Sequence, residues 1–382
     1  MKITKTKKQV IIGVTTLFSI LLISTIVFWP YFSTFFGLGS KISFTKHTLE
    51  GPSEATSISY YDLDLDGDID LLGASHTEKL FCWWENTGSN EFSYHIISNS
   101  VTSASGLEAG DLDMDGDVDL IGSALLTNQI ILFENIGNLT FNKTIITDSF
   151  TTTISLELED INGDEYLDII ACACGNNKLS WFENKKNLTF VEQVVTTSLS
   201  DAVKCIPIDF DADNDMDIIA MGEAPGVICW YENNGTQNFE QHIVYSIEGM
   251  THGITPADFD LDGDLDIGGC TIEGDGTVEW FESLDNNEFE HHILSTSFLG
   301  ANFVTSGDID QDGDFDIIAC AADSNQIAYW QNKGGGKFKK IIISKDFASA
   351  MTILVDVDND NDLDILVVSH HPGEFAWFEN MS

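Results

Sequence analysis

Seven short segments of the chain share a pattern of carboxylates at alternate positions, which is complete in six of them. The first is Asp62–Asp70, in which positions 1, 3, 5, 7 and 9 are all aspartate. The other copies begin at Asp111, Asp160, Asp209, Asp258, Asp308 and Asp356, each 48 to 50 residues after the one before. A repeat this regular indicates one supersecondary unit that the chain uses seven times.

The carboxylate spacing predicts a site for a hard cation. Alternation places the side chains of Asp62, Asp64 and Asp66 on one side of a tight turn, and Asp70 returns as the first residue of the next strand. The carbonyl of Asp68 supplies a further oxygen. Ca²⁺ takes roughly 6–8 oxygen ligands in flexible geometry, whereas Mg²⁺ demands an octahedron and keeps its waters. Transition metals prefer His or Cys, which the loops lack.

Acidic turns without metal are the alternative interpretation of these loops. Five carboxylates in nine residues repel one another strongly unless a cation lies among them. We therefore predict up to seven Ca²⁺ ions, one per unit, with a structural role at the link between the first and second strands. Gly67, at position 6, allows the sharp reversal that such a turn needs.

The composition excludes one class of partner. The chain has 382 residues, 62 Asp plus Glu, 17 Lys and a formal net charge of −45, with no Arg. Nucleic acid is not expected as a partner, because phosphate binding needs clustered Lys and Arg. Hydrophobic residues make up 43% of the chain, which is enough for a large core.

Each unit is predicted to contain four short strands. A small apolar run leads into the carboxylate loop, a consecutive apolar run follows it, then an aromatic strand such as Trp181–Asn184, and last a run such as Phe141–Ile145. Consecutive apolar residues are typical of a strand buried on both faces. Four strands in about 49 residues predict one blade of a β-propeller. The fold class is therefore all-β, a seven-bladed propeller over residues 41–382.

The two ends of this region predict how the ring closes. The last unit stops after its third strand, at Asn380, and a matching fourth strand precedes the first loop as residues 44–49. The N-terminal strand is thus expected to complete the last blade. Closure removes the exposed edge that an open sheet would present.

The loops, the unit length and the Trp-Phe-Glu-Asn strands resemble the FG-GAP/VCBS calcium-loop repeats, which form the seven-bladed propeller of integrin α-subunit heads and many microbial surface proteins. The resemblance covers all seven units. It implies Ca²⁺ at positions 1, 3, 5, 7 (by the carbonyl) and 9 of each loop. Beyond the first loop these are Asp111, Asp113, Asp115, Asp117 and Asp119; Asp160, Asn162, Asp164, Tyr166 and Asp168; Asp209, Asp211, Asp213, Asp215 and Asp217; Asp258, Asp260, Asp262, Asp264 and Asp266; Asp308, Asp310, Asp312, Asp314 and Asp316; and Asp356, Asp358, Asp360, Asp362 and Asp364.

Three loops depart from the pattern at position 6. The third has Glu165 where Gly is usual, together with Asn162 and Tyr166, so its site is the one we expect to be weakest. The fourth and seventh have Asn214 and Asn361 there, which is tolerable because Asn also adopts positive φ.

The N-terminal region predicts a membrane anchor. Residues 1–9 carry four lysines and residues 10–39 carry no charge. Val10–Phe28 is close to the roughly 20 residues that cross a bilayer as a helix. The positive-inside rule then places residues 1–9 in the cytoplasm and the propeller outside the cell, in a single-pass cell-membrane protein. A cleaved signal peptide, which would leave the propeller secreted, is the alternative.

The sequence indicates the function of the protein less clearly than its fold. In the family the face opposite the calcium loops usually contacts ligands; here its polar residues include His76, Glu78, Lys79, Glu223, His252, Glu273, Asp275, Asp323, His370, His371 and Glu374. No nucleophile motif or phosphate loop supports catalysis. We expect recognition or adhesion toward an extracellular protein or polysaccharide. A propeller-fold polysaccharide lyase or dehydratase, and a structural cell-surface role, are the alternatives.

Two periodic residue types are expected to be structural. His47, His95, His242 and His292 recur at one position of the fourth strand, which predicts a cross-strand role. Most Trp residues are periodic and predict packing positions, whereas Trp84 breaks the pattern and is expected to be exposed. Cys172, Cys270 and Cys320 are expected in buried strands.

Overall fold

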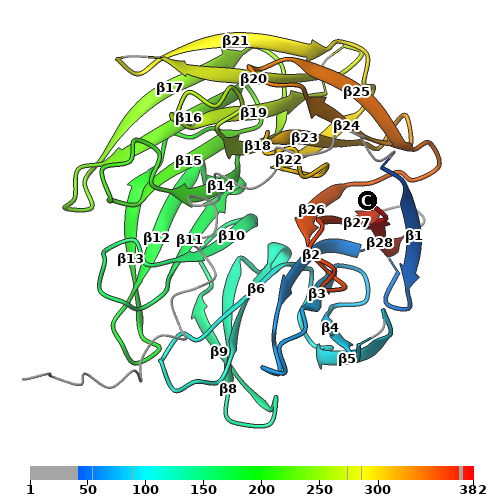
Figure 1. Cartoon of the computed structure of the whole chain (residues 1–382). Coiled ribbons are helices and arrows are strands. Elements are labelled where there is room, and N and C mark those ends of the chain that lie inside the picture. Colours follow the sequence, from blue (N-terminus) through cyan, green and yellow to red (C-terminus); the bar gives the residue numbers. More distant parts are fainter. Residues whose placement is uncertain (1–41, 54, 89, 273, 285, 370–372) are drawn as a thin grey trace, which may run out of the picture. The chain divides into compact units, whose positions relative to one another are not determined.

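The computed structural model describes residues 42–53, 55–88, 90–272, 274–284, 286–369 and 373–382. These residues form seven four-stranded antiparallel sheets, numbered here as blades 1 to 7 (Figure 1). The predicted all-β, seven-bladed propeller is confirmed. The helix and anchor predicted for residues 10–39 lie outside the described residues. Within the described ranges, no helix has the length and apolar character to cross a membrane.

Blades 1 to 3 follow one another in sequence order. Blade 1 contains β2 (Ala55–Tyr61), β3 (Asp70–Ser75), β4 (Leu80–Asn86) and β5 (Phe92–Ser98). Blade 2 contains β6 (Ala104–Gly110), β7 (Asp119–Ala124), β8 (Gln129–Asn135) and β9 (Phe141–Thr147), with the short 3-10 helix η1 (Leu125–Thr127). Blade 3 contains β10 (Thr153–Glu159), β11 (Asp168–Ala173), β12 (Lys178–Asn184) and β13 (Phe190–Thr196), with η2 (Cys174–Asn176).

Blades 4 to 6 repeat this order. Blade 4 contains β14 (Ala202–Ile208), β15 (Asp217–Gly222), β16 (Gly226–Asn233) and β17 (Phe239–Ile247). Blade 5 contains β18 (Thr251–Ala257), β19 (Asp266–Thr271), β20 (Thr277–Leu284) and β21 (Glu288–Ser295). Blade 6 contains β22 (Ala301–Gly307), β23 (Asp316–Ala321), β24 (Gln326–Asn332) and β25 (Phe338–Ser344).

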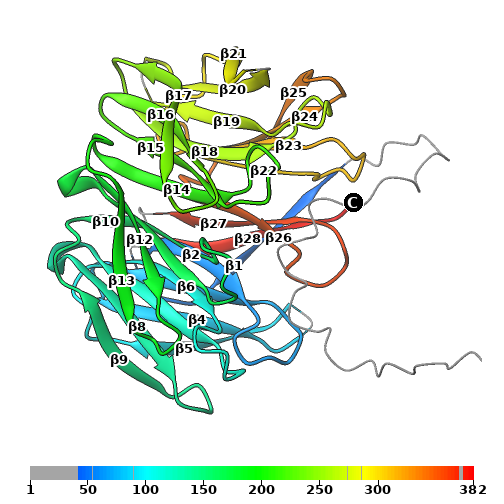
Figure 2. The same ribbon diagram turned by 90° about the vertical axis from the view of Figure 1, so that its left-hand side faces the viewer.

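Blade 7 joins the two ends of the described chain. It contains β26 (Met351–Val355), β27 (Asp364–Ser369), β28 (Glu374–Asn380) and β1 (Phe44–Leu49). The ladder between β1 and β28 runs from Phe44 opposite Asn380 to Leu49 opposite Phe375. Both views place β1, in blue, beside β28, in red (Figures 1 and 2). The predicted closure by residues 44–49 is therefore confirmed.

The second strand of every blade is buried along its whole length, as the consecutive apolar residues predicted. First strands of neighbouring blades contact one another around the inside of the ring. Fourth strands lie at the outside and are largely exposed or half-buried (Figure 1). Each blade is therefore most deeply buried at its second strand, between a partly exposed first strand and an exposed outer strand.

The core is divided into seven clusters, one between each pair of adjacent blades. Aromatic rings from third strands fill these seams. At the seam of blades 1 and 2, for example, Phe81 packs edge-on against Phe133 at 5.7 Å between ring centroids. Gly122 makes room there, because a Cβ at this position would lie 2.7 Å from the Phe81 ring. All seven cysteines are free, and Cys172, Cys270 and Cys320 are buried as predicted.

Candidate metal centre

The seven carboxylate loops all connect a first strand to a second strand. In blade 1 the loop begins one residue after β2 ends at Tyr61, and its ninth residue, Asp70, opens β3. The second strands of the other blades likewise begin at the ninth residues, namely Asp119, Asp168, Asp217, Asp266, Asp316 and Asp364. The predicted placement of every loop within its blade is therefore confirmed.

Backbone N–H groups orient the carboxylates within each loop. In the first loop, Asp62 accepts hydrogen bonds from the N–H groups of Asp66 (3.0 Å) and Gly67 (3.1 Å), and Asp64 accepts one from Asp66 (3.2 Å). Asp66 in turn accepts the N–H of Asp68 at 2.9 Å. The loop thus closes on its own side chains before any cation is considered.

This arrangement brings the side chains at positions 1, 3 and 5 together. One ligand oxygen from each lies within 4.8 Å of the others in the first, second, fourth and fifth loops, the sets being Asp62, Asp64 and Asp66; Asp111, Asp113 and Asp115; Asp209, Asp211 and Asp213; and Asp258, Asp260 and Asp262. An all-oxygen cluster of this size suits Ca²⁺.

Two positions of each loop adopt positive φ. At position 6, φ is 100° for Gly67, and the predicted tolerance holds for Asn214 (72°) and Asn361 (73°). Position 4 also has positive φ, which sequence reasoning missed because Leu65 (62°) and Met114 (60°) are unusual there. A left-handed non-glycine residue costs roughly 1–2 kcal/mol. The loops therefore hold strain that the hydrogen bonds to carboxylates must offset.

The third loop folds like the others despite its different sequence. Glu165 adopts a φ of 75°, and its N–H donates to Asp160 at 2.6 Å, as Gly67 does to Asp62. The glycine has moved to position 4, as Gly163, so one of the two strained positions is relieved. Tyr166 occupies position 7, where the expected ligand is the carbonyl. The backbone of this loop therefore gives no reason for a weaker site.

Raised carboxyl pKa values show that negative charges are crowded together in the loops. Burial raises the pKa of Asp64, and the neighbouring Asp66 carboxylate raises it further. The same two causes contribute to the pKa of Asp312, which is raised to about 6. Four buried side-chain oxygens at positions 1 or 3 have no hydrogen-bond partner among the described residues: those of Asp111, Asn162, Asp310 and Asp358. Unpartnered buried oxygens are costly, and a Ca²⁺ ion among them would remove the cost.

The carboxylate at position 9 of each loop has a different environment from those at positions 1, 3 and 5. Asp70 is fully buried, and its two oxygens accept the N–H of Leu63 at 2.9 Å and the N–H of Asn86 at 2.8 Å. Burial raises its pKa to about 7, although both hydrogen bonds oppose that rise. The same pair of backbone hydrogen bonds occurs in all seven blades. This residue ties its loop to the end of the third strand, and its predicted role as a ligand would use the remaining lone pairs.

The asparagine at the end of the third strand extends this tie to the preceding blade. The Asn332 side chain donates to the carbonyl of Phe315 in its own loop and to that of Phe259 in the loop of blade 5. Asn86, Asn184 and Asn380 reach the preceding loop in the same way. In blade 5 the residue is Ser283, which keeps the backbone bond to Asp266.

The polar residues predicted on the opposite face do not converge. His252 pairs with Glu223 at 2.9 Å, Glu78 accepts hydrogen bonds from Ser53, and His76 bonds to Ser103. Glu273, His370 and His371 lie outside the described residues. These contacts are local pairs within or between loops.

The four periodic histidines have the predicted cross-strand role. His47, His95, His242 and His292 each bond a glutamate of the third strand at 2.6–2.8 Å and stack on the Trp directly opposite. The prediction that Trp84 is exposed is wrong. Its side chain is 1% exposed, because it occupies the column that holds Phe or Tyr in most other blades and packs on Phe375.

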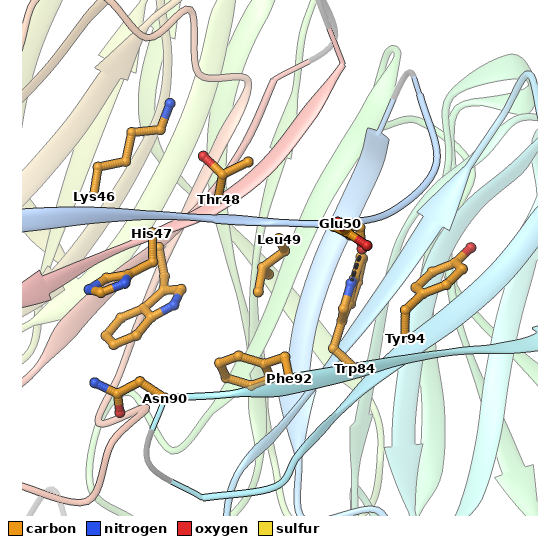
Figure 3. Close-up of a pocket in the computed structure, with 10 residues that line it drawn as sticks. Lys46, His47, Thr48, Leu49, Glu50, Trp84, Asn90, Phe92 and Tyr94 are labelled. Atoms are coloured by element: carbon orange, nitrogen blue, oxygen red, sulfur yellow. Dashed lines mark hydrogen bonds between the residues drawn. The ribbon is translucent and has the colours of Figure 1, made fainter.

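A groove lies at the seam of blades 7 and 1, between β1 and β5 (Figure 3). Its volume is about 430 Å³, and its lining combines aromatic side chains with polar and charged ones. His47 and Leu49 point from β1 toward Asn90 and Phe92, whereas Lys46 and Thr48 point to the other side of the strand (Figure 3). The indole N–H of Trp84 donates to the carbonyl of Glu50 at 2.6 Å.

The comparisons with known proteins agree with this architecture. The FG-GAP-like repeat matches residues 43–122, 160–220, 209–268 and 308–367, which together are more than half of the chain. The chain therefore belongs to the FG-GAP-like repeat family, as the loops and strands indicated. No protein of the curated set matches it.

Solved structures share the fold at low sequence identity. An Agrocybe aegerita lectin, described as recognising non-reducing terminal N-acetylglucosamine, is 19% identical with a TM-score of 0.56, over 78% of this chain and 81% of the lectin. Virginiamycin B lyase from Staphylococcus aureus is 12% identical with a TM-score of 0.60, over 88% and 99%. The BBS1N chain, solved in complex with ARL6DN, is 11% identical with a TM-score of 0.62, over 87% and 95%. Such likeness shows the fold alone.

The side-chain hydrogen bonds of Asn332 predict that its replacement will destabilise the protein. Asn332→Ser removes both side-chain donations and leaves the buried carbonyls of Phe259 and Phe315 short of a donor, while the backbone bond to Asp316 remains. Unfolding in denaturant should show a loss of roughly 1–3 kcal/mol. Asn142→Ser, on the exposed face of β9, is the control and should be nearly neutral. Equal effects of the two changes would contradict the tie.

Metal removal is predicted to destabilise the whole ring. Each Ca²⁺ site held at 100 times its Kd contributes about 2.7 kcal/mol to the folded state. Several such sites should raise the melting temperature by on the order of 10 °C or more in millimolar Ca²⁺ relative to EDTA. Calorimetric scans in Ca²⁺, in EDTA and in EDTA followed by excess Mg²⁺ measure this. Superimposable scans in Ca²⁺ and EDTA would rule out the metal assignment.

Proposed function

We propose that this chain is an extracellular, calcium-binding propeller that recognises a polysaccharide. The groove at the seam of blades 7 and 1 is the observation that carries the ligand class. Calcium holds the loops, and the groove provides the recognition surface. Recognition of a protein ligand is the alternative that the experiment below distinguishes.

The lining of the groove suits a sugar. Phe92, Tyr94 and His47 are half-buried and offer ring surface, while Asn90 and Glu50 supply hydrogen-bonding groups. Ligand sites commonly combine aromatic surface with a few placed polar groups. Sugar rings carry both an apolar face and hydroxyl groups, so they match this combination.

An unused donor at the base of the groove supports the same proposal. Trp377 is fully buried and lines the groove, and its indole nitrogen has no hydrogen-bond partner among the described residues. Buried indole N–H groups usually find an acceptor. A hydroxyl of a bound ligand is one candidate acceptor. The lectin that shares this fold recognises a terminal N-acetylglucosamine, which agrees with a sugar as the ligand class.

The net charge of the chain limits the class of polysaccharide that it could bind. The formal charge of the chain is −45, and seven Ca²⁺ ions would leave it near −31. An anionic polysaccharide would meet long-range repulsion at such a surface. The proposed ligand is therefore a neutral or amino-containing polysaccharide.

The predicted location belongs to the same proposal. The uncharged segment of residues 10–39 would hold the propeller on the outer side of the cell membrane, and cleavage of that segment would release it. Either case gives the loops access to extracellular Ca²⁺. Topology is measurable by protease digestion of intact cells.

Groove variants are predicted to lose binding. His47→Ala and Tyr94→Ala remove ring surface from the groove and should each weaken polysaccharide binding by about tenfold, or roughly 1.4 kcal/mol. His242→Ala and Gln241→Ala change the corresponding positions of blade 4, away from the groove, and serve as controls. A glycan array in millimolar Ca²⁺ selects the sugar, and calorimetry measures its affinity.

The outcomes separate the candidate functions. Binding of a glycan that falls in both groove variants and not in the controls supports recognition. Release of unsaturated or dehydrated sugar products would instead identify a lyase or dehydratase. Capture of a protein but no glycan would overturn the ligand class, and no binding of either would leave the structural cell-surface role.

A further inference from the structure

Blades 4 and 5 carry a second type of possible metal site, which uses side chains of the third and fourth strands of the blade. In blade 5, Glu282 on β20 and Glu290 and His292 on β21 each offer one ligand atom, and these atoms lie within 4.8 Å of one another. The set mixes carboxylate oxygen with imidazole nitrogen. It therefore differs in chemistry from the all-oxygen loops.

The strand register explains why these side chains meet. Glu282 is directly opposite Glu290 in the ladder, and Trp280 is directly opposite His292. The His292 ring stacks on the Trp280 indole with centroids 4.5 Å apart and planes 19° apart, and its Nε2 lies 2.7 Å from the Glu282 carboxylate. The stacking contact fixes the ring so that this nitrogen points at the two carboxylates.

The second glutamate has no structural explanation in this arrangement. His292 already satisfies Glu282, whereas Glu290 adds a like charge directly across the ladder, which is unfavourable. In the described part of the chain no lysine forms an ion pair with Glu290. A cation bound by both carboxylates and the imidazole would turn this repulsion into attraction.

A comparison of the blades shows that the second glutamate is present in some blades that have the His–Glu pair and absent from others. Blade 4 repeats the full set as Glu232, Glu240 and His242, with the same register and a 2.6 Å contact between His242 and Glu232. Blades 1 and 7 keep the His–Glu pair but have Ser93 and Thr45 in place of the second glutamate. The described residues thus contain two complete sets and two matched incomplete ones.

The geometry points to two sites for a divalent transition ion of the Zn²⁺ type, one on the outer strands of blade 4 and one on those of blade 5. Each has one imidazole and two carboxylates, a donor set that Zn²⁺ accepts. Glu290 and Glu240 are exposed, so the remaining coordination positions face solvent. The sites adjoin the carboxylate loops: besides burial, the charges of Glu232 and Glu282 help to raise the pKa of Asp211 and Asp260. They lie in other blades than the groove at the seam of blades 7 and 1.

Zinc titration tests this proposal with the incomplete blades as controls. The untagged chain, with Cys174→Ser to remove its half-exposed thiol, is saturated with Ca²⁺ and titrated with Zn²⁺ in a calorimeter. The parent should bind two equivalents more than the double variant Glu240→Ser and Glu290→Ser. Each single variant, which copies blade 1, should lose one equivalent.

A gain-of-site variant keeps the test decisive if a loss variant folds poorly. Ser93→Glu in blade 1 completes a third set opposite Glu85 and beside His95, and it should add one equivalent of Zn²⁺. Equal zinc stoichiometry in the parent and the double variant would overturn the proposal. An unchanged stoichiometry in Ser93→Glu would do so as well.

Discussion

The ring depends on a buried carboxylate, the ninth residue of each loop. Asp70 and its six counterparts are each held by two backbone N–H groups, one from the start of the loop and one from the end of the third strand. A single side chain therefore connects three parts of a blade. The neighbouring asparagine extends the connection to the preceding blade in four of the seven cases.

Backbone hydrogen bonds to carboxylates also help the folded chain to accommodate its large negative charge. Carboxylates gather in turns that backbone N–H groups and positive-φ residues shape into cation-sized clusters. Apolar clusters fill the seams between blades, with aromatic rings packed against glycine gaps, and polar contacts such as that of Lys204 with Glu157 join neighbouring first strands. Much of the repulsion therefore lies at sites where Ca²⁺ would neutralise it, and hydrophobic burial stabilises the seams between the blades.

Much of the fold could be predicted because it is periodic. The spacing of Asp62, Asp111 and the later copies set the number of blades, and residues 44–49 revealed the closure. Features that break the period could not be predicted in this way. Trp84 interrupts the tryptophan column, which predicts exposure, whereas contact with Phe375 at the seam buries it. Its burial also helps to form the groove, which involves segments from both ends of the described chain.

The candidate metal sites also differ in how far they could be predicted from the sequence. Features formed within one turn could be predicted, whereas features that depend on strand pairing could not. Positions 1, 3 and 5 could be predicted from alternation, because they come together within a single turn. The positive φ of Leu65 was missed, since only the carboxylate cluster makes it acceptable. The pairing of Glu282 with Glu290 depends on strand register, which the sequence pattern alone does not specify to one residue.

A count of bound calcium tests the account most directly. The purified chain is dialysed against micromolar Ca²⁺ and its metal content is measured by atomic emission, beside a variant in which Asp160 and Asn162 of the third loop are both changed to Ala. The account predicts seven Ca²⁺ ions per chain and six in the variant. No bound Ca²⁺, or the same number in both proteins, would contradict it.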